Sequence, residues 1–222
     1  MMVTIDGPAG SGKSTVARAV AQRLGWTFID TGAMYRAAAW QADRLGIERS
    51  EAERLVELSR DLDLSFAWSN DELRVIVEGQ DVTDELREER LSALASAIAT
   101  IGEVRSAMVD RQRELASRFE NVITEGRDQG SVAFPDADLK IFLDASVEER
   151  AKRRCRQLAG SGQPADYDQI LDSIQRRDMQ DRSRAAAPLV IPHGAVRLDT
   201  TDLTLDQVIS RVLDLIEATR GR

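Results

Sequence analysis

A short glycine-rich segment near the start of the chain has residue types that suit phosphate binding. Its nine residues are Gly7-Pro8-Ala9-Gly10-Ser11-Gly12-Lys13-Ser14-Thr15, between an apolar run at 2–5 and a helical pattern from 16 onward. Glycines let backbone N–H groups turn toward an anion, and a helix start adds partial positive charge. Lys13 would reach the outer phosphates of a nucleoside triphosphate, and the Ser14 hydroxyl would bind Mg²⁺. The segment therefore predicts a nucleoside triphosphate site.

Composition narrows the class of protein around this loop. The chain has 222 residues and a formal net charge of −8, which disfavours nucleic acid and anionic membranes as partners. Its single cysteine, Cys155, excludes an internal disulfide and fits a reducing compartment. We find no apolar run long enough to cross a bilayer and no signal peptide before the first predicted strand. We therefore expect a cytoplasmic protein.

Short apolar runs alternate with helical patterns along most of the chain. Strands are predicted at 2–6, 27–30, 121–124, 139–143 and 195–199, and helices at 13–24, 32–45, 146–157 and from 204 onward. Ser146 with Glu149, and Thr204 with Gln207, have the spacing of helix capping boxes. This alternation predicts an α/β fold of the phosphate-loop type, with a parallel sheet covered by helices on both faces.

The middle of the chain departs from this alternation. Residues 62–68 and 73–77 alternate apolar and polar side chains, and turn residues lie at 69–71 and 79–81. They predict a small antiparallel sheet inserted at about 61–89. Residues 160–164 lie between two arginine-rich predicted helices, and their composition is typical of a flexible segment. This composition fits a short lid over a phosphate site and an ordinary surface loop equally well.

Two further segments that follow predicted strands contain phosphate-binding residue types. After the second strand, Thr31 and Arg36 could hold a phosphate at a helix start. The alternative is simple capping of that helix by Asp30 or Thr31, but the two roles are compatible and we expect both. After the third strand, Arg127 could grip a phosphate while Asp128 accepts hydrogen bonds from a sugar or a base amine. The alternative for this second segment is a structural Arg–Asp pair that braces the turn.

A third group lies on one predicted helix, which we expect to end at Pro188. Arg177, Asp181 and Arg184 are spaced i, i+4 and i+7, so one helix face would present all three. Two guanidinium groups with a carboxylate between them could contact donor and acceptor phosphates in one transition state. The alternative is a solvated helix face with salt bridges.

A phosphate loop alone is shared by kinases, GTPases, motors and regulators. No lysine, at 13, 140 or 152, follows an asparagine, so the guanine-recognition element N-K-x-D is absent from the sequence. Small transferases remain the leading class. A non-catalytic ATP-binding regulator is the alternative from another class, although it would have no need for the arginines at 177 and 184.

Together these segments resemble the bacterial cytidylate kinase family of nucleoside monophosphate kinases. The matching segments cover essentially the whole chain: 4–15, 30–36, 126–130, 134–137, 140–143 and 177–189. The resemblance implies ATP-dependent, Mg²⁺-assisted phosphorylation of CMP and dCMP by a monomer, with UMP or dTMP as alternative acceptors. It also implies a core at about 1–60 and 103–222, a region at about 31–102 that binds the nucleoside monophosphate, and a lid at about 153–165.

The resemblance further implies roles for individual residues. ATP would bind at Gly7–Thr15 and Arg153. The residues expected at CMP are Thr31, Arg36, Ser96, Arg105, Arg127, Asp128, Arg177, Asp181 and Arg184. Among the cationic residues, Lys13, Arg127, Arg177 and Arg184 would act on the transferring phosphate. Gln129 stands where the family usually has an apolar residue.

Overall fold

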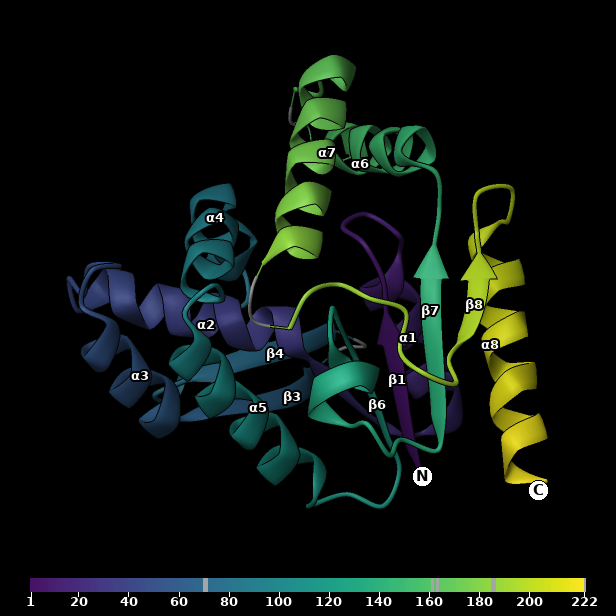
Figure 1. The fold of residues 1–222 in the computed structure, drawn as a ribbon, viewed down its shortest axis with the longest axis horizontal. Coiled ribbons are helices and arrows are strands. Elements are labelled where there is room, and N and C mark those ends of the chain that lie inside the picture. The colour runs from purple at the N-terminus through teal and green to yellow at the C-terminus, as the bar shows by residue number, and fades with distance from the viewer. Residues whose placement is uncertain (70–71, 161, 163, 185–186, 222) are drawn as a thin grey trace. The chain divides into compact units, whose positions relative to one another are not determined.

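The structure, a computed structural model, describes residues 1–69, 72–160, 162, 164–184 and 187–221. It divides into two compact units (Figure 1). The first unit comprises Met1–Phe28 and Phe119–Arg222, and the second comprises Ile29–Arg118. Strand β2 (Thr27–Asp30) begins in the first unit and ends in the second.

The first unit is built on a five-stranded sheet in the order β2-β6-β1-β7-β8. Its remaining elements are β1 (Met2–Asp6), α1 (Lys13–Leu24), β6 (Val122–Gly126), the π-helical turn η2 (Gln129–Ala133), β7 (Leu139–Asp144), α6 (Val147–Gly160), α7 (Tyr167–Ser183), β8 (Val196–Asp199) and α8 (Leu205–Arg220). β1 is central and pairs in parallel with β6 and β7, and β8 continues the parallel sheet beside β7. The prediction of a parallel sheet is confirmed.

The centre of this sheet is apolar because strands covered on both faces need continuous apolar runs. Val3 and Ile5 of β1, Ile123 of β6 and Ile141 of β7 are fully buried. Helices α1 and α8 pack against each other, α1 against β6 and β1, and α8 against β7. Turn η2 packs against β1 and β6. The parallel arrangement brings the carboxyl ends of β1, β6 and β7 to one edge, where the following loops begin.

The second unit combines helices with the small sheet that the sequence predicted. Its elements are α2 (Thr31–Arg44), α3 (Ala52–Asp61), β3 (Leu64–Ser69), β4 (Glu72–Val77), β5 (Gln80–Asp81), the 3₁₀ turn η1 (Glu85–Arg87), α4 (Glu89–Ile98) and α5 (Gly102–Ala116). Strands β3, β4 and β5 are antiparallel. Leu73, Val75 and Val77 of β4 are buried, as their alternation with Arg74 and Ile76 requires. Helix α2 packs against α3, α4 and β4.

Some local predictions hold and others need adjustment. Thr204 and Gln207 form the complete capping box at the start of α8. At α6, the Ser146 hydroxyl accepts from the Glu149 backbone N–H, but the Glu149 side chain instead binds Arg153 and Arg156. Residues 70 and 71 of the predicted turn, and 161 and 163 of the predicted lid, lie outside the described residues. In the described part of the chain, no helix has the length and apolar character needed to span a bilayer.

Candidate active site

The glycine-rich loop connects β1 to α1 in the first unit and leaves the start of α1 open to an anion. Gly12, the N-cap, is left-handed with φ 91° and provides no side-chain cap, and the first turn contains no acidic residue. The first N–H groups of a helix have no intrahelical partner. At Gly7, a Cβ would overlap the Leu143 carbonyl oxygen, so only glycine fits there. The loop geometry agrees with the predicted phosphate site.

Lys13 is buried at the base of this loop. Its ammonium donates to the Pro8 carbonyl at 2.9 Å. Burial, followed by the charge of Arg127, lowers the pKa of Lys13 to about 7 despite the nearby carboxylates of Glu125 and Asp6. A bound anion would stabilise the ammonium form and reverse this shift. The carboxylates near Lys13 therefore do not fully balance the positive charge of the site.

Glu125, at the end of β6, is a site residue that sequence reasoning did not single out. Its carboxylate is buried and accepts from the Ser14 hydroxyl at 2.8 Å. A carboxylate and a hydroxyl are hard oxygen ligands of the kind that Mg²⁺ prefers, so this pair fits a magnesium ion bound together with phosphates. The available signal was an acidic residue at the end of a buried strand.

Asp6 is a second residue whose importance only the structure reveals. It ends β1, and its carboxylate accepts from the backbone N–H groups of Gln129 and Gly130 at 2.8 and 2.7 Å. Burial raises the pKa of Asp6 to about 6, against the lowering effect of these two hydrogen bonds. Asp6 thereby holds the segment after Asp128 beside the phosphate loop.

Arg127 and Asp181 form the main ion pair of the site. Arg127 Nε donates to Asp181 Oδ2 at 2.7 Å, and Arg184 lies 3.6 Å from the other carboxylate oxygen. Burial by itself raises the pKa of Asp181, but the charge and hydrogen bond of Arg127, then the charges of Arg184 and Arg177, lower it below its ordinary value. Arg127 therefore pairs with Asp181 of α7, and the alternative in which it merely braces its own turn through Asp128 is not supported.

The prediction that one helix extends to Pro188 and contains all three residues of its face is wrong. Helix α7 ends at Ser183, and Arg184 is its extended C-cap. Arg184 Nε donates to the Ala187 carbonyl, and the Leu189 N–H donates to the Asp181 carbonyl, so the chain turns back earlier. Arg184 nevertheless remains beside Asp181, whereas Arg177 is exposed on α7 and acts on Asp181 through its charge.

Asp128 and Gln129 are both buried, with different surroundings. The Asp128 carbonyl accepts from Val132 and Ala133 at the start of η2. The Gln129 side chain is 1% exposed, and its amide oxygen accepts from the Thr124 hydroxyl at 2.9 Å. The Gln129 amide is thus part of a buried polar pair on β6 and η2.

Arg153 of α6 lies against the phosphate loop. Its guanidinium donates to the Ser11 carbonyl at 3.5 Å and to the Thr200 hydroxyl at 3.0 Å, and it also bonds Glu149. A Cβ at Gly12 would contact the same guanidinium. Its position is compatible with a role at the donor nucleotide.

Four predicted substrate residues lie in the second unit. Asp30 caps α2 by accepting from the Ala33 N–H at 2.7 Å, and Arg36 lies 3.6 Å from its carboxylate. Thr31 is buried at the start of the same helix. Ser96 lies half-buried on α4, and Arg105 is buried on α5, over the Tyr35 ring. The capping interpretation of Asp30 is confirmed, which leaves phosphate binding by Thr31 and Arg36 as a prediction.

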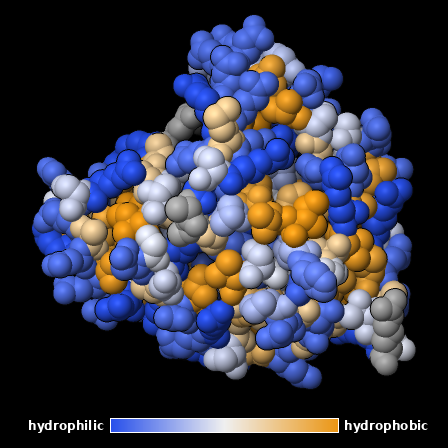
Figure 2. All heavy atoms as spheres, in the orientation of Figure 1, coloured by the Kyte–Doolittle hydropathy of each residue, from blue (hydrophilic) through white to orange (hydrophobic). Residues whose placement is uncertain are grey.

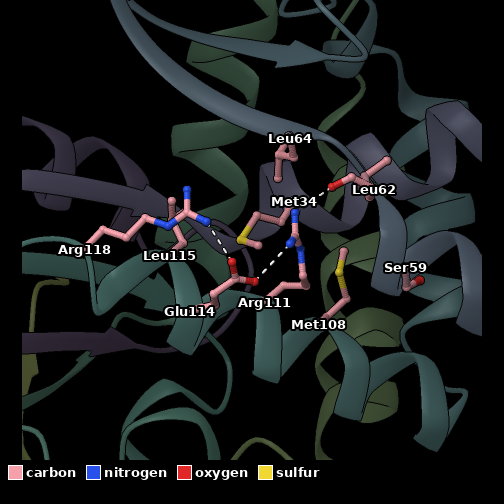
Figure 3. A pocket seen from close by; sticks show the side chains of 9 residues that line it. All are labelled: Met34, Ser59, Leu62, Leu64, Met108, Arg111, Glu114, Leu115 and Arg118. Carbon is pink, nitrogen blue, oxygen red and sulfur yellow. Dashed lines mark hydrogen bonds and ion pairs between the residues drawn. The ribbon is translucent and has the colours of Figure 1, made fainter.

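The second unit also contains a hollow that includes none of these residues (Figure 3). Figure 3 shows Met34, Met108 and Leu62 around it. At its rim, Glu114 binds both Arg111 and Arg118, and Arg111 also donates to the Leu62 carbonyl. Because Glu114 already pairs with both arginines of its lining, this hollow lacks the free positive charge of a phosphate site.

Comparison with known proteins identifies the family. The sequence profile described as cytidylate kinase matches residues 3–218. The chain is 46% identical over 214 residues to the cytidylate kinase of Caldanaerobacter subterraneus, covering 96% of this chain and 93% of the relative. It is 44% identical over 220 residues to that of Azotobacter vinelandii, covering 98% and 96%.

Solved structures share the fold at low sequence identity. TT1252 from Thermus thermophilus superposes with a TM-score of 0.50 at 21% identity, covering 98% of this chain and 96% of that one. A gluconokinase from Sinorhizobium meliloti gives a TM-score of 0.50 at 18% identity, covering 99% and 94%. With a family match over nearly its full length and a phosphate-loop site in its first unit, the chain belongs to the cytidylate kinase family.

Proposed function

We propose how the residues described above carry out the family reaction, the phosphorylation of CMP and dCMP with ATP as donor. The supporting observation is a cluster of four cationic side chains in the first unit. The four residues are Lys13, Arg127, Arg177 and Arg184. The charges of Arg127 and Arg177 help to lower the pKa values of both Lys13 and Asp181, and Arg184 lies beside Asp181. Such a concentration of positive charge suits a transition state in which negative charge is spread over transferring phosphate oxygens.

In this proposal the donor phosphates bind to the residues from Gly7 to Thr15. The free N–H groups at the start of α1 point at the phosphate oxygens, and Lys13 exchanges the Pro8 carbonyl for the outer phosphate. Arg153, which already contacts this loop, would contact ATP from α6. Residues at about 153–165 would form the lid, and its closure would exclude water, which otherwise hydrolyses ATP.

Ser14 and Glu125 would hold the magnesium ion, which neutralises phosphate charge when bound. Glu125 accepts from the Ser14 hydroxyl, so it orients the hydroxyl oxygen while supplying negative charge next to the cation site. Both side chains belong to neighbouring elements of the first unit, α1 and β6.

The acceptor phosphate would be held by Arg127, Arg177 and Arg184, with Asp181 orienting the first and third of these. Asp128 and Asp181 would accept hydrogen bonds from the cytosine or the sugar. We extend the set of CMP-binding residues to Thr31, Arg36, Ser96 and Arg105, which all lie in the second unit. No general base is needed in this mechanism, because the acceptor phosphate is already an anionic nucleophile. Catalysis then rests on positioning and charge stabilisation.

A coupled assay with ATP, Mg²⁺ and a panel of nucleoside monophosphates tests this proposal. We expect turnover with CMP and dCMP, and far less with UMP, dTMP or AMP. Transfer to AMP or dTMP without transfer to CMP would contradict the acceptor assignment. Light scattering on the eluting protein tests the expected monomer and should give the mass of one chain.

A further inference from the structure

A buried arginine outside the groups described above joins the phosphate loop to α7. Arg150, on α6, is only 4% exposed. Most of the side chains that cover α6 and α7 in Figure 2 are hydrophilic, but Arg150 is buried beneath the surface instead of contributing to it. It donates to the Ala145 carbonyl at 3.0 Å, to the Ala9 carbonyl at 2.9 Å, and to both carboxylate oxygens of Asp178 at 3.2 and 2.6 Å. Arginine is rarely buried without such partners.

The contact with Ala9 bears on the shape of the phosphate loop. In a planar trans peptide the carbonyl and the following N–H point in opposite directions. Because the Ala9 carbonyl points at Arg150, the Gly10 N–H points away from it. Gly10 is left-handed with φ 75°, and a Cβ on it would lie 3.3 Å from the Arg150 Cβ. A glycine peptide rotates easily, so the Arg150 hydrogen bond selects one of its orientations.

The contact with Asp178 bears on the arginines of the acceptor site. Asp178 and Asp181 are three residues apart on α7, so they are neighbours on its buried side. Asp178 binds Arg150, which holds the phosphate loop, while Asp181 binds Arg127, which follows β6. Because these two bonded carboxylates lie on successive turns, they fix both the rotation of α7 about its axis and its position along that axis. Their neighbour Arg177 and the C-cap Arg184 are placed accordingly.

We propose that Arg150 and Asp178 are positioning residues that hold the Ala9–Gly10 peptide and the α7 arginines in one fixed relation. The inference rests on the proposed function, because it assumes that the loop binds the donor and that α7 binds the acceptor. Neither side chain needs to touch a nucleotide. Because the desolvation of a buried ion pair offsets much of its attraction, the Arg150–Asp178 pair need not stabilise the fold, and a positioning role can be distinguished from a structural one by experiment.

Two conservative variants separate the two halves of this role. Arg150→Lys keeps the charge but loses the planar fork that reaches Ala9 and Asp178 together. We expect ATP to bind at least fivefold more weakly and kcat to fall at least tenfold. Asp178→Asn keeps the shape and leaves Arg150 bonded to Ala9. We expect the Kd for ATP to stay within twofold of wild type while kcat falls at least fivefold.

Matched controls come from exposed positions on the same helices. Lys152→Arg on α6 and Asp172→Asn on α7, both exposed and outside the proposed lid, should leave kcat and ATP affinity within twofold. All variants are compared well below their Tm, with the folded fraction measured by circular dichroism. A purely structural role would lower Tm without changing kcat or Kd per folded molecule.

The outcomes distinguish this inference from the proposed function. Wild-type turnover with CMP together with near-normal kcat in a folded Asp178→Asn variant overturns the positioning role alone. If wild type does not use CMP, the proposed function fails, and the difference in ATP affinity between the two variants still decides the loop half of the inference. Should Arg150→Lys fail to fold, the kinetics of Asp178→Asn decide the helix half.

Discussion

Arg127, one residue beyond β6, donates a 2.7 Å hydrogen bond to Asp181 of α7, 54 residues further along the chain. This pair joins two segments that each looked capable of binding phosphate by itself. Arg184 approaches the second oxygen of the same carboxylate, so Asp181 orients two guanidinium groups. Removing the carboxylate should therefore disturb both arginines together.

Asp181→Ala should impair CMP use far more than ATP binding. Losing the Asp181 carboxylate frees the side chains of Arg127 and Arg184 to shift. As a result, kcat/KM for CMP should fall by about tenfold or more. ATP on the glycine-rich loop should bind almost as in wild type. Separate titrations of ATP and CMP check this. Equal weakening of both ligands, or of neither, would mean that the cluster is only a structural salt bridge.

The pH dependence of stability gives an independent check on this carboxylate. The pKa of Asp181 is lowered in the folded protein, so its stabilising contribution is present above its ordinary pKa of 3.8 and disappears as the pH falls through the folded value. Asp181→Asn should therefore lower Tm at pH 7, and the difference from wild type should shrink under strongly acidic conditions. A constant difference at all pH values would contradict the ionised pair.

Lys13→Met should reduce kcat by orders of magnitude while stabilising the free protein. The pKa of Lys13 falls from 10.5 to about 7 on folding, so charging it in the folded state costs stability below pH 7, and this cost fades as the pH rises toward 10.5. We expect Tm to rise by a few degrees at pH 6.5, with a smaller gain at pH 9. Near-normal turnover, or a lower Tm at both pH values, would contradict the assigned role and environment of Lys13.

Glu125→Gln should raise the Mg²⁺ requirement of the reaction. The variant keeps an acceptor for the Ser14 hydroxyl but removes the negative charge beside it. The Mg²⁺ concentration for half-maximal rate should increase about tenfold or more, while ATP binding in the presence of EDTA changes little. Titration of activity against Mg²⁺ measures this directly, and an unchanged midpoint would remove Glu125 from the cation site.

Gln129→Leu should affect stability more than catalysis. The substitution removes the acceptor of the buried Thr124 hydroxyl, which costs about 1–3 kcal/mol when the donor is left without a partner. KM for CMP should stay within about twofold, because the Gln129 amide oxygen bonds toward β6. Thermal melts of this variant and of Thr124→Val/Gln129→Leu test the pairing, since the double variant should recover part of the loss. A large KM change would place Gln129 at the substrate.

Local features were predictable from the sequence because residues close together in the chain determine them. The helix from Lys13 to Leu24 begins after Gly12 and ends at Gly25, and both glycines are left-handed in the structure. The capping box at Thr204 and the alternation in β4 depend equally on near neighbours. The phosphate loop belongs to the same class, since its glycines and helix start are contiguous.

Long-range packing decided the rest. The strand order, with β6 between β2 and β1, depends on pairing between segments about 120 residues apart, such as Met2 with Val122. Nothing near Asp181 in the sequence predicts Arg127 as its partner, and nothing near Arg150 predicts its burial against Ala9 and Asp178. Helix α7 ends at Ser183, where Arg184 bonds to the Ala187 carbonyl and Leu189 to the Asp181 carbonyl, contacts that helix periodicity does not predict. The residue types indicated the chemistry, and only the tertiary structure determined which charges meet, since ion pairs depend on distances that sequence spacing does not specify.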